Sequence, residues 1–435
     1  MKARTLILCL MAAVSCSSAK EPVLEMTVLD PGHFHASLLQ KNRLQFVSDT
    51  VRVYAPEGEE LQAYLDAVEA YNSRCDSPTA WKMELHVQDN FLDALPEAGK
   101  GCFVVLAGNN RCKAEYIARC VELGYNVLSD KPMAITAEDF DQLRKAYALA
   151  QSKNLVIYDM MTERYEILNR IVRTLIPMED VFGKVDGAIE IEDVHYFCKM
   201  VSGKPLIRPQ WYFDVEQQGY GIADVTTHFI DIVFWECFPD LPITPSDLVL
   251  RKAEMYPTVI TREQFRAVTG AAEYPDYLKK YLRNGKLEVL SNGKIDFEVK
   301  GQPVIINVRW DYAPEDGEAD RFFQKIPGTV SSIEIVQDAT SGYSRELRLR
   351  IPSGELADKV GKRLADDFPN VKLKAVGDYY LVEVPQEARL PHEEHFNKVG
   401  QAFTEYVRNG GMPDWENSNT LSKYYLTTKS VEAAK

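Results

Sequence analysis

The strongest constraint on the fold is an alternation of short apolar runs and helical patterns between residues 25 and 158. Apolar runs of this kind suit strands of a parallel sheet that is covered on both faces. The helical patterns include Lys113–Leu123, which Gly124 closes, and a helix that opens at Thr136 with a capping residue and an acidic first turn. The predicted strands are Leu24–Leu29, Val51–Tyr54, Met83–Val87 and Cys102–Ala107. The alternation predicts a doubly wound, Rossmann-type parallel sheet over residues 23–158.

The sequence changes character beyond residue 158, and 435 residues favour two domains over one. A helix is expected over Thr162–Leu175, and an amphipathic helix over His395–Asn409 ends at Gly410. Residues 355–385 read as a helix and a strand, which we interpret as an insertion. Several strand candidates alternate in polarity, as in antiparallel sheets with one solvated face: Val185–Glu192, Leu248–Met255, Ile295–Val299, Val304–Trp310, Ser332–Val336 and Glu346–Ile351. Residues 159–435 are therefore predicted to form an α+β domain for substrate binding and oligomerisation.

Two polar segments, one in each predicted domain, carry the chemistry. Ser129-Asp130-Lys131-Pro132 ends an apolar run, and Gly221-Ile222-Ala223-Asp224-Val225-Thr226-Thr227-His228-Phe229-Ile230-Asp231 follows in the second domain. Asp224 and His228 are four residues apart and would share one face of a helix. A lysine, an aspartate and a histidine together can move the proton of a hydroxyl group while a cofactor takes the hydride. We predict Lys131, Asp224 and His228 as catalytic residues.

These segments resemble the family of glucose–fructose oxidoreductase, inositol 2-dehydrogenase and the rhizopine-catabolism enzymes (Gfo/Idh/MocA). The family reads Glu-Lys-Pro in the first segment and Gly-Gly-x-x-x-Asp-x-Gly-x-His-x-x-Asp in the second. The chain departs from it where Asp130 stands for the glutamate and Tyr220 and Thr226 replace glycines. The matching residues include Lys131, Pro132, Asp224, His228 and Asp231. The resemblance implies a second domain with a large, mostly antiparallel open sheet, an NAD or NADP cofactor and a homo-oligomer.

The expected cofactor end departs from the dinucleotide fingerprint. The turn after the first strand reads Asp30-Pro31-Gly32-His33-Phe34-His35-Ala36, and only Gly32 matches. His33 and His35 could contact phosphate or substrate, or they could cap the turn. Their spacing could also suit a metal, but no carboxylate cluster supports that and no metal is predicted. We assign Gly32, His33, Phe34 and His35 to the cofactor, and the resemblance adds Asn109, Asn110, Asp130, Lys131 and Pro132.

Several side chains are candidates for substrate contact. Aromatic rings stack on the apolar faces of sugars, and arginine can clamp carboxylates or hydroxyls. The loop Lys204–Phe213 is rich in both kinds, although it could simply pack on the sheet. The candidates are Arg164, His195, Arg208, Trp211 and Tyr212.

Charge and the N-terminus limit the partners and the compartment. The net charge of −14 without a basic stripe argues against nucleic acid. Residues 1–20 read as a signal peptide whose apolar core is too short to span a bilayer. Ala13-Val14-Ser15-Cys16 resembles a lipoprotein box that would lipidate Cys16, and the alternative is a plain secretory signal. We expect an exported bacterial protein, in the periplasm or held at a membrane only by a lipid anchor.

Three functions are consistent with these features. The first is an NAD(P)-dependent oxidoreductase acting on a hydroxyl of a sugar, polyol or glycoside. The second is a glycoside-cleaving enzyme that recycles a tightly bound NAD through oxidation and elimination, as some members of the family do. The third is a non-catalytic carbohydrate-binding lipoprotein. Export favours a retained cofactor, and the sparse glycines favour a binder, but the presence of Lys131, Asp224 and His228 places the oxidoreductase first.

Overall fold

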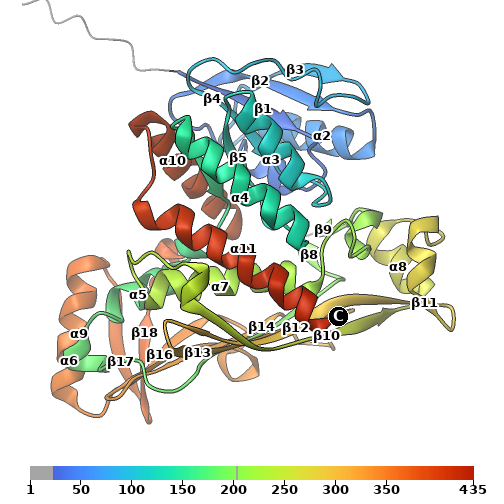
Figure 1. The fold of residues 1–435 in the computed structure, drawn as a ribbon. Coiled ribbons are helices and arrows are strands. Elements are labelled where there is room, and N and C mark those ends of the chain that lie inside the picture. Colours follow the sequence, from blue (N-terminus) through green and yellow to red (C-terminus); the bar gives the residue numbers. More distant parts are fainter. Residues whose placement is uncertain (1–22, 202–203) are drawn as a thin grey trace, which may run out of the picture.

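A computed structural model describes residues 23–201 and 204–435, so the predicted signal peptide and Cys16 lie outside the described residues. The N-terminal domain holds a six-stranded, wholly parallel sheet in the order β3-β2-β1-β4-β5-β6 (Figure 1). This order is that of the doubly wound dinucleotide-binding fold, and it confirms the Rossmann-type prediction. The strands are β1 (Leu24–Leu29), β2 (Val47–Ala55), β3 (Lys82–Val87), β4 (Cys102–Leu106), β5 (Asn126–Ser129) and β6 (Ile157–Asp159).

The helices of this domain follow the local signals in the sequence. Thr136 caps α4 through a reciprocal capping box with Asp139, as the sequence predicts. The helix that follows β1 spans only one turn, and the loop before it contains a single glycine, Gly32. The helices are α1 (His35–Leu38), α2 (Glu59–Ser73), α3 (Lys113–Glu122) and α4 (Ala137–Ser152).

The second domain is built on a ten-stranded mixed sheet in which only β7 and β13 pair in parallel. Its path is β10-β12-β13-β7-β14-β15-β16-β18-β17, with β11 paired to β12, which confirms a large, mostly antiparallel open sheet. The strands are β7 (Ile189–Tyr196), β10 (Leu248–Ile260), β11 (Leu282–Arg283), β12 (Lys286–Val299), β13 (Gln302–Asp311), β14 (Arg321–Pro327), β15 (Ser332–Gln337), β16 (Glu346–Arg350), β17 (Lys372–Val376) and β18 (Tyr379–Glu383). A separate hairpin joins β8 (Met200–Val201) and β9 (Lys204–Pro205).

Helices cover one face of this sheet and bury its apolar side chains (Figure 1). They are α5 (Ile167–Leu175), α6 (Glu179–Phe182), α7 (Thr226–Cys237), α8 (Arg262–Thr269) and α9 (Gly354–Asp367). The predicted helix Thr162–Leu175 is interrupted: Thr162–Tyr165 is a 3-10 turn, and the carboxylate of Glu166 then caps α5. The predicted strand Val185–Glu192 was placed too early, because its pairing with β13 and β14 begins near Ile189. The segment 355–385 forms α9 and the β17–β18 hairpin at the edge of the sheet.

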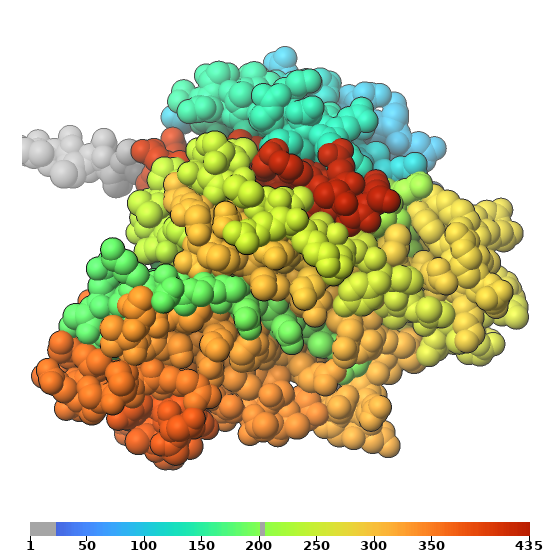
Figure 2. Space-filling view, turned by 60° about the horizontal axis from the view of Figure 1, so that its bottom comes forward, coloured from blue at the N-terminus to red at the C-terminus, as the bar shows by residue number. Residues whose placement is uncertain are grey.

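The last two helices, α10 (His392–Asn409) and α11 (Asp414–Ala434), return to the N-terminal domain. Phe396, Val399 and Phe403 of α10 belong to the apolar core beneath β1 and β2. Helix α11 lies between the two domains (Figure 1), and its residues, in dark red, reach the surface between the teal and yellow-green parts of the chain in Figure 2. The strands of the two domains thus divide after β6, at residue 159 rather than the predicted 158, whereas α10 and α11 come late in the sequence and pack on the N-terminal domain. None of the helices in the described ranges has the length and apolarity needed to cross a bilayer.

Candidate active site

Two adjoining cavities open where the strands of the N-terminal sheet end against the second domain. The cavity at the end of β2, here the β2 cavity, measures about 670 Å³ and is lined by the β1–α1 loop and the start of α2. The neighbouring cavity measures about 580 Å³ and is lined by six of the seven histidines, so we call it the histidine cavity. Six residues line both cavities, which makes them parts of one cleft: His33, Phe34, Leu206, Arg208, Trp211 and Tyr212.

Lys131 and Asp224 meet in the histidine cavity as an ion pair that joins the two domains. Lys131 Nζ donates to Asp224 Oδ1 at 2.6 Å, and both side chains are largely buried. Burial alone would lower the pKa of Lys131, but Asp224 outweighs it and the pKa is raised. The same pair lowers the pKa of Asp224 against the opposing effect of its burial. Lys131 is therefore a charged hydrogen-bond donor and Asp224 an ionised acceptor at neutral pH.

His228 reaches the same cavity from the first turn of α7. The expectation that Asp224 and His228 share one helix face is wrong, because α7 begins at Thr226 and Asp224 lies in the preceding turn. Burial and the nearby Lys131 charge lower the pKa of His228 to about 4. Its Nδ1 is buried and has no hydrogen-bond partner among the described residues. At neutral pH His228 is thus an uncharged imidazole that can accept a proton.

Gly221 allows this arrangement of the second segment. A Cβ atom at this position would lie 2.0 Å from the backbone oxygen of Ser291 on β12. The close approach of the loop before α7 to the large sheet therefore requires glycine here. This contact fixes the height at which Asp224 and His228 project above the sheet.

The β1–α1 loop brings His33 and His35 onto the carboxylate of Asp130. The Nδ1 atoms of His33 and His35 lie 3.3 Å and 2.9 Å from Asp130 Oδ2. Burial lowers the pKa of both imidazoles, that of His35 to about 3, while the histidine contacts keep Asp130 ionised despite its burial. Phe34 extends from the same loop and lines both cavities, whereas Pro132, which follows a cis peptide bond, lines neither.

Four of the five predicted substrate residues line the histidine cavity. His195 pairs with Asp193 at 2.7 Å; burial opposes its protonation, but Asp193 and Asp320 outweigh burial and raise its pKa to about 9. The Arg208 guanidinium stacks on Tyr212 and Trp310, 4.6 Å and 5.2 Å from the ring centroids. The hydroxyl of Tyr212 donates to Asp224 at 3.5 Å. This side of the cleft is therefore aromatic and cationic.

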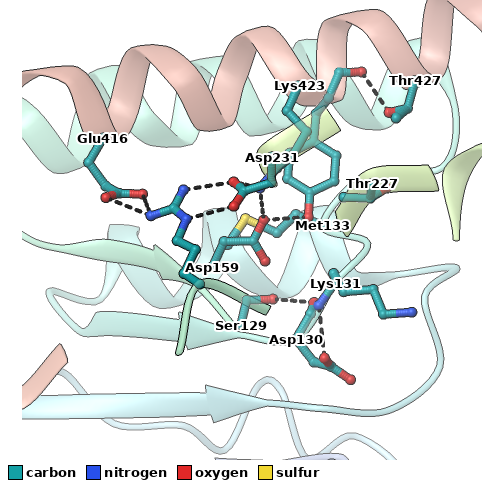
Figure 3. Close-up of polar contacts among 12 residues, drawn as sticks. Ser129, Asp130, Lys131, Met133, Asp159, Thr227, Asp231, Glu416, Lys423 and Thr427 are labelled. Atoms are coloured by element: carbon teal, nitrogen blue, oxygen red, sulfur yellow. Dashed lines mark hydrogen bonds and ion pairs between the residues drawn. The ribbon is translucent and has the colours of Figure 1, made fainter. Parts of the chain in front are cut away.

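The prediction that Arg164 contacts the substrate is wrong, because its guanidinium is fully used in a buried ion network outside both cavities. Arg164 forms paired hydrogen bonds with Asp231 and with Glu416 at 2.6–2.9 Å (Figure 3). Lys423 of α11 completes the network by contacting both Asp231 and Asp159 at 2.9 Å. Asp231 lies one turn beyond His228, so this network anchors the helix that carries the imidazole.

The two adjacent asparagines, both of which the resemblance assigned to the cofactor, lie in different surroundings. Asn109, the better match in sequence, donates to Gln217 and does not line either cavity. Asn110 lines the histidine cavity and accepts a hydrogen bond from Lys113. Lys113 was not predicted as a site residue. Its ammonium also donates to the backbone oxygen of Asp130 at 3.1 Å, and burial lowers the pKa of Lys113 to about 8.

Other residues of the site were also missed. Glu163 and Arg345 form an ion pair at 2.8 Å in the histidine cavity, although they are far apart in the sequence. His392 and His395 enter the same cavity from the first turn of α10. Their i,i+3 spacing on an amphipathic helix was a signal that could have been used, because it aims both rings to one side.

The β2 cavity fits a dinucleotide in position and shape. It lies at the carboxyl ends of β1 and β2, beside β4, where the strand order reverses. A Cβ at Gly108 would lie 2.3 Å from the backbone oxygen of Asp30, so the loops after β1 and β4 form a close backbone cradle. Gly32 would face a pyrophosphate in this cavity, and the acidic stretch Glu57–Glu60 would face ribose hydroxyls, whereas Gly108 lines the adjoining histidine cavity. The carboxylate of Glu60, which accepts a hydrogen bond from Trp211 Nε1 at 2.6 Å, occupies the space in front of Gly32, 2.6 Å from where a Cβ would stand, so it would have to turn away for a pyrophosphate to approach this glycine.

Comparison with known proteins agrees with this geometry. Residues 32–159 match the family model described as "Oxidoreductase family, NAD-binding Rossmann fold", and residues 171–435 match "Putative oxidoreductase C terminal domain". The crystal structure of a "putative oxidoreductase" from Parabacteroides merdae is 40% identical, with a TM-score of 0.91, and the match covers 94% of this chain and 97% of that chain.

More distant relatives share the fold or part of the sequence. Levoglucosan dehydrogenase in complex with NADH and levoglucosan gives a TM-score of 0.58 at 15% identity, over 94% of this chain and 97% of that chain. The Bacillus subtilis "Putative oxidoreductase YteT" is 22% identical over 147 residues, which are 34% of this chain and 32% of that relative. The match thus spans about a third of the relative's length. Together, the two family models and the geometry of the cleft show that the chain belongs to the Gfo/Idh/MocA family of oxidoreductases, with an N-terminal NAD-binding Rossmann domain.

Proposed function

We propose that this protein oxidises or reduces a hydroxyl-bearing carbon of a sugar, polyol or glycoside in the histidine cavity. The observation that carries the proposal is the Lys131–Asp224 ion pair beside the uncharged His228, in a cavity that adjoins the β2 cavity. The lining of the histidine cavity, in which Tyr212 and Trp310 pack beside the Arg208 guanidinium, supports a sugar as the occupant, because it combines apolar and polar contacts.

The protonation states assign a role to each of the three residues. Lys131 is charged, so it donates a hydrogen bond to the reacting oxygen and stabilises negative charge on it. His228 is uncharged and accepts the hydroxyl proton. Asp224 holds the Lys131 ammonium in place and keeps it protonated. When bound, the nicotinamide would supply the hydride acceptor or donor.

A second candidate is glycoside cleavage through oxidation and elimination. Removal of an aglycone requires a base for a carbon-bound proton and an acid for the leaving oxygen, in addition to the groups that act on the hydroxyl. The histidine cavity holds more titratable groups than a single oxidation uses, among them His195, Glu163 and His392. This surplus is the observation that favours the second candidate.

The first experiment is to purify the full chain from its native compartment, denature it and detect released NAD(H) or NADP(H) by mass spectrometry. We expect nearly one cofactor per chain. Sugars and glycosides are then screened with Lys131→Met and His228→Asn against His86→Gln, a control that replaces an exposed histidine outside both cavities. Both site variants should lose about 100-fold or more in kcat, and the control should not. Full activity in both site variants would refute the assignment, and a protein that binds no NAD(P) would favour a carbohydrate binder.

The proposal extends to the compartment. We propose an exported protein that retains its cofactor, because the N-terminal segment combines a basic start, a short apolar core and Cys16 in a lipoprotein-like box. A homo-oligomer formed through the large sheet remains part of the proposal, on the basis of the family resemblance.

A further inference from the structure

A cluster of two histidines and one aspartate lies at the junction of the two cavities, and the roles proposed above leave it without a function. His33 and His35 come from the β1–α1 loop, and Asp130 comes from the end of β5, so no sequence spacing connects all three. One ligand atom from each residue lies within 4.8 Å of the other two. The carboxylate that was missing beside the His33/His35 pair in the sequence is thus supplied by the fold.

The distances suit a metal ion. Bonds of about 2.0–2.2 Å from a transition metal to imidazole nitrogen and carboxylate oxygen put neighbouring ligands roughly 3.0–3.5 Å apart. The two distances from Asp130 Oδ2 to the imidazole Nδ1 atoms are 2.9 Å and 3.3 Å. Furthermore, His33 Nδ1 is buried and makes no hydrogen bond among the described residues. A buried nitrogen of this kind is a ligand atom in need of a partner.

The charges also leave room for a cation. Asp130 is 4% exposed, and within the described ranges no side-chain nitrogen of a lysine or arginine lies within 4.0 Å of its carboxylate. Lys131 Nζ is paired with Asp224, and Lys113 Nζ donates to the backbone oxygen of Asp130 rather than to its side chain. A buried carboxylate without a direct counter-charge is costly.

The surroundings hold the three ligands in place and leave one side open. The backbone N–H of Lys131 donates to Asp130 Oδ1 at 3.0 Å, which orients Oδ2 toward the imidazoles. The ring of His35 packs against Phe396 of α10, with centroids 4.5 Å apart. All three ligands line the histidine cavity, so further coordination positions would face its interior.

We propose that His33, His35 and Asp130 form a binding site for one divalent transition-metal ion. Two imidazoles and one carboxylate are a donor set for Zn²⁺, Mn²⁺ or Fe²⁺ rather than for Ca²⁺ or Mg²⁺, which favour all-oxygen sites. The open positions can take a hydroxyl or carbonyl oxygen of whatever occupies the cavity. The site does not depend on the function proposed above, because metal binding is measured without turnover.

The test uses the full chain after treatment with a chelator and removal of that chelator. Zn²⁺ and Mn²⁺ are titrated separately by isothermal calorimetry, and bound metal is counted by elemental mass spectrometry after desalting. Co²⁺ is added as a third probe, because its visible absorption reports coordination by nitrogen and oxygen. We expect one equivalent of metal per chain.

Three variants locate the site. Asp130→Asn and the pair His33→Gln/His35→Gln should each weaken binding by at least about tenfold, since even indirect partners of a metal commonly have effects of this size. His392→Gln/His395→Gln, in the same cavity but outside the cluster, should bind like the wild type. Circular dichroism shows whether each variant is folded. If the His33→Gln/His35→Gln variant does not fold, the metal affinity of Asp130→Asn decides the test. The proposal is overturned if the folded wild type binds none of the three ions. It is also overturned if only the His392→Gln/His395→Gln variant loses metal binding.

Discussion

Replacing Lys423 with methionine removes one charge from the centre of the molecule and preserves most of the volume of the side chain. Lys423 is fully buried, and its ammonium lies 2.9 Å from both Asp159 and Asp231, which are 1% and 3% exposed. Two carboxylates would lose a direct counter-charge, with Arg164 remaining for Asp231 only. Removing one partner of a buried ion pair costs about 3–5 kcal/mol, so we expect the free energy of unfolding to fall by that amount.

Urea denaturation followed by circular dichroism measures this loss. The matched control is Lys429→Met on the exposed side of the same helix, which should change stability by less than about 0.5 kcal/mol. Adding Asp159→Asn to the Lys423→Met variant removes one unpaired charge and keeps an acceptor for Tyr424, so it should restore about 1 kcal/mol or more. Equal stabilities for the Lys423 and Lys429 variants would refute this account of the network.

Three further predictions concern protonation and export. Because the pKa of His228 is lowered to about 4, kcat/KM should be constant near neutral pH and fall only toward pH 4. The residual activity of His228→Asn should not show this fall at acidic pH. A fall of the wild-type kcat/KM centred near pH 6.5 would contradict the assignment. The pKa of His195 is raised to about 9, so its protonation stabilises the fold fully below pH 6.5 and this stabilisation is lost as pH rises through 9. The difference in Tm between wild type and His195→Gln should therefore shrink from pH 6.5 to pH 9. A difference that stays constant over this range would show that the protonation of His195 does not stabilise the fold. Cys16→Ser should release the protein from the membrane fraction of a bacterial host, measured by fractionation with a lipid label; unchanged labelling would exclude lipidation of Cys16.

The sequence predicted strands such as Leu24–Leu29 and Cys102–Ala107 because burial leaves a local pattern, whereas β14 (Arg321–Pro327) was not predicted. Leu24–Leu29 and the neighbouring apolar runs are buried on both faces, so each residue reports its environment directly. Helix α11 gave no such pattern, and its residues 414–434 were not predicted as a helix. Its buried positions include Glu416, Asn419 and Lys423, whose partners come from distant parts of the chain. Polarity along α11 therefore indicated exposure where the structure has burial.

The same reason explains which parts of the site were predictable. Lys131, Asp224 and His228 were found because they lie in two short segments that resemble a known family. The Asp130 contacts with His33 and His35 could not be predicted, because they depend on how the ends of β1 and β5 meet across the sheet. Arg164 was misjudged for a related reason: its residue type suits both a substrate clamp and a buried ion pair, and only the positions of Asp231 and Glu416 distinguish them.

The position of α11 has a consequence for the order of events during synthesis. A ribosome releases this helix after every strand in the described part of the chain, yet Tyr424 and Lys423 hold Asp159 at the end of β6, in the domain made first. The emerging N-terminal domain therefore contains acidic groups whose partners have not yet been translated, and it can reach its final packing only after the chain is nearly finished. We expect a ribosome-bound chain that stops before residue 414 to be sensitive to protease and unable to hold a dinucleotide. If the protein crosses a membrane as an unfolded chain, the cofactor must be acquired on the far side.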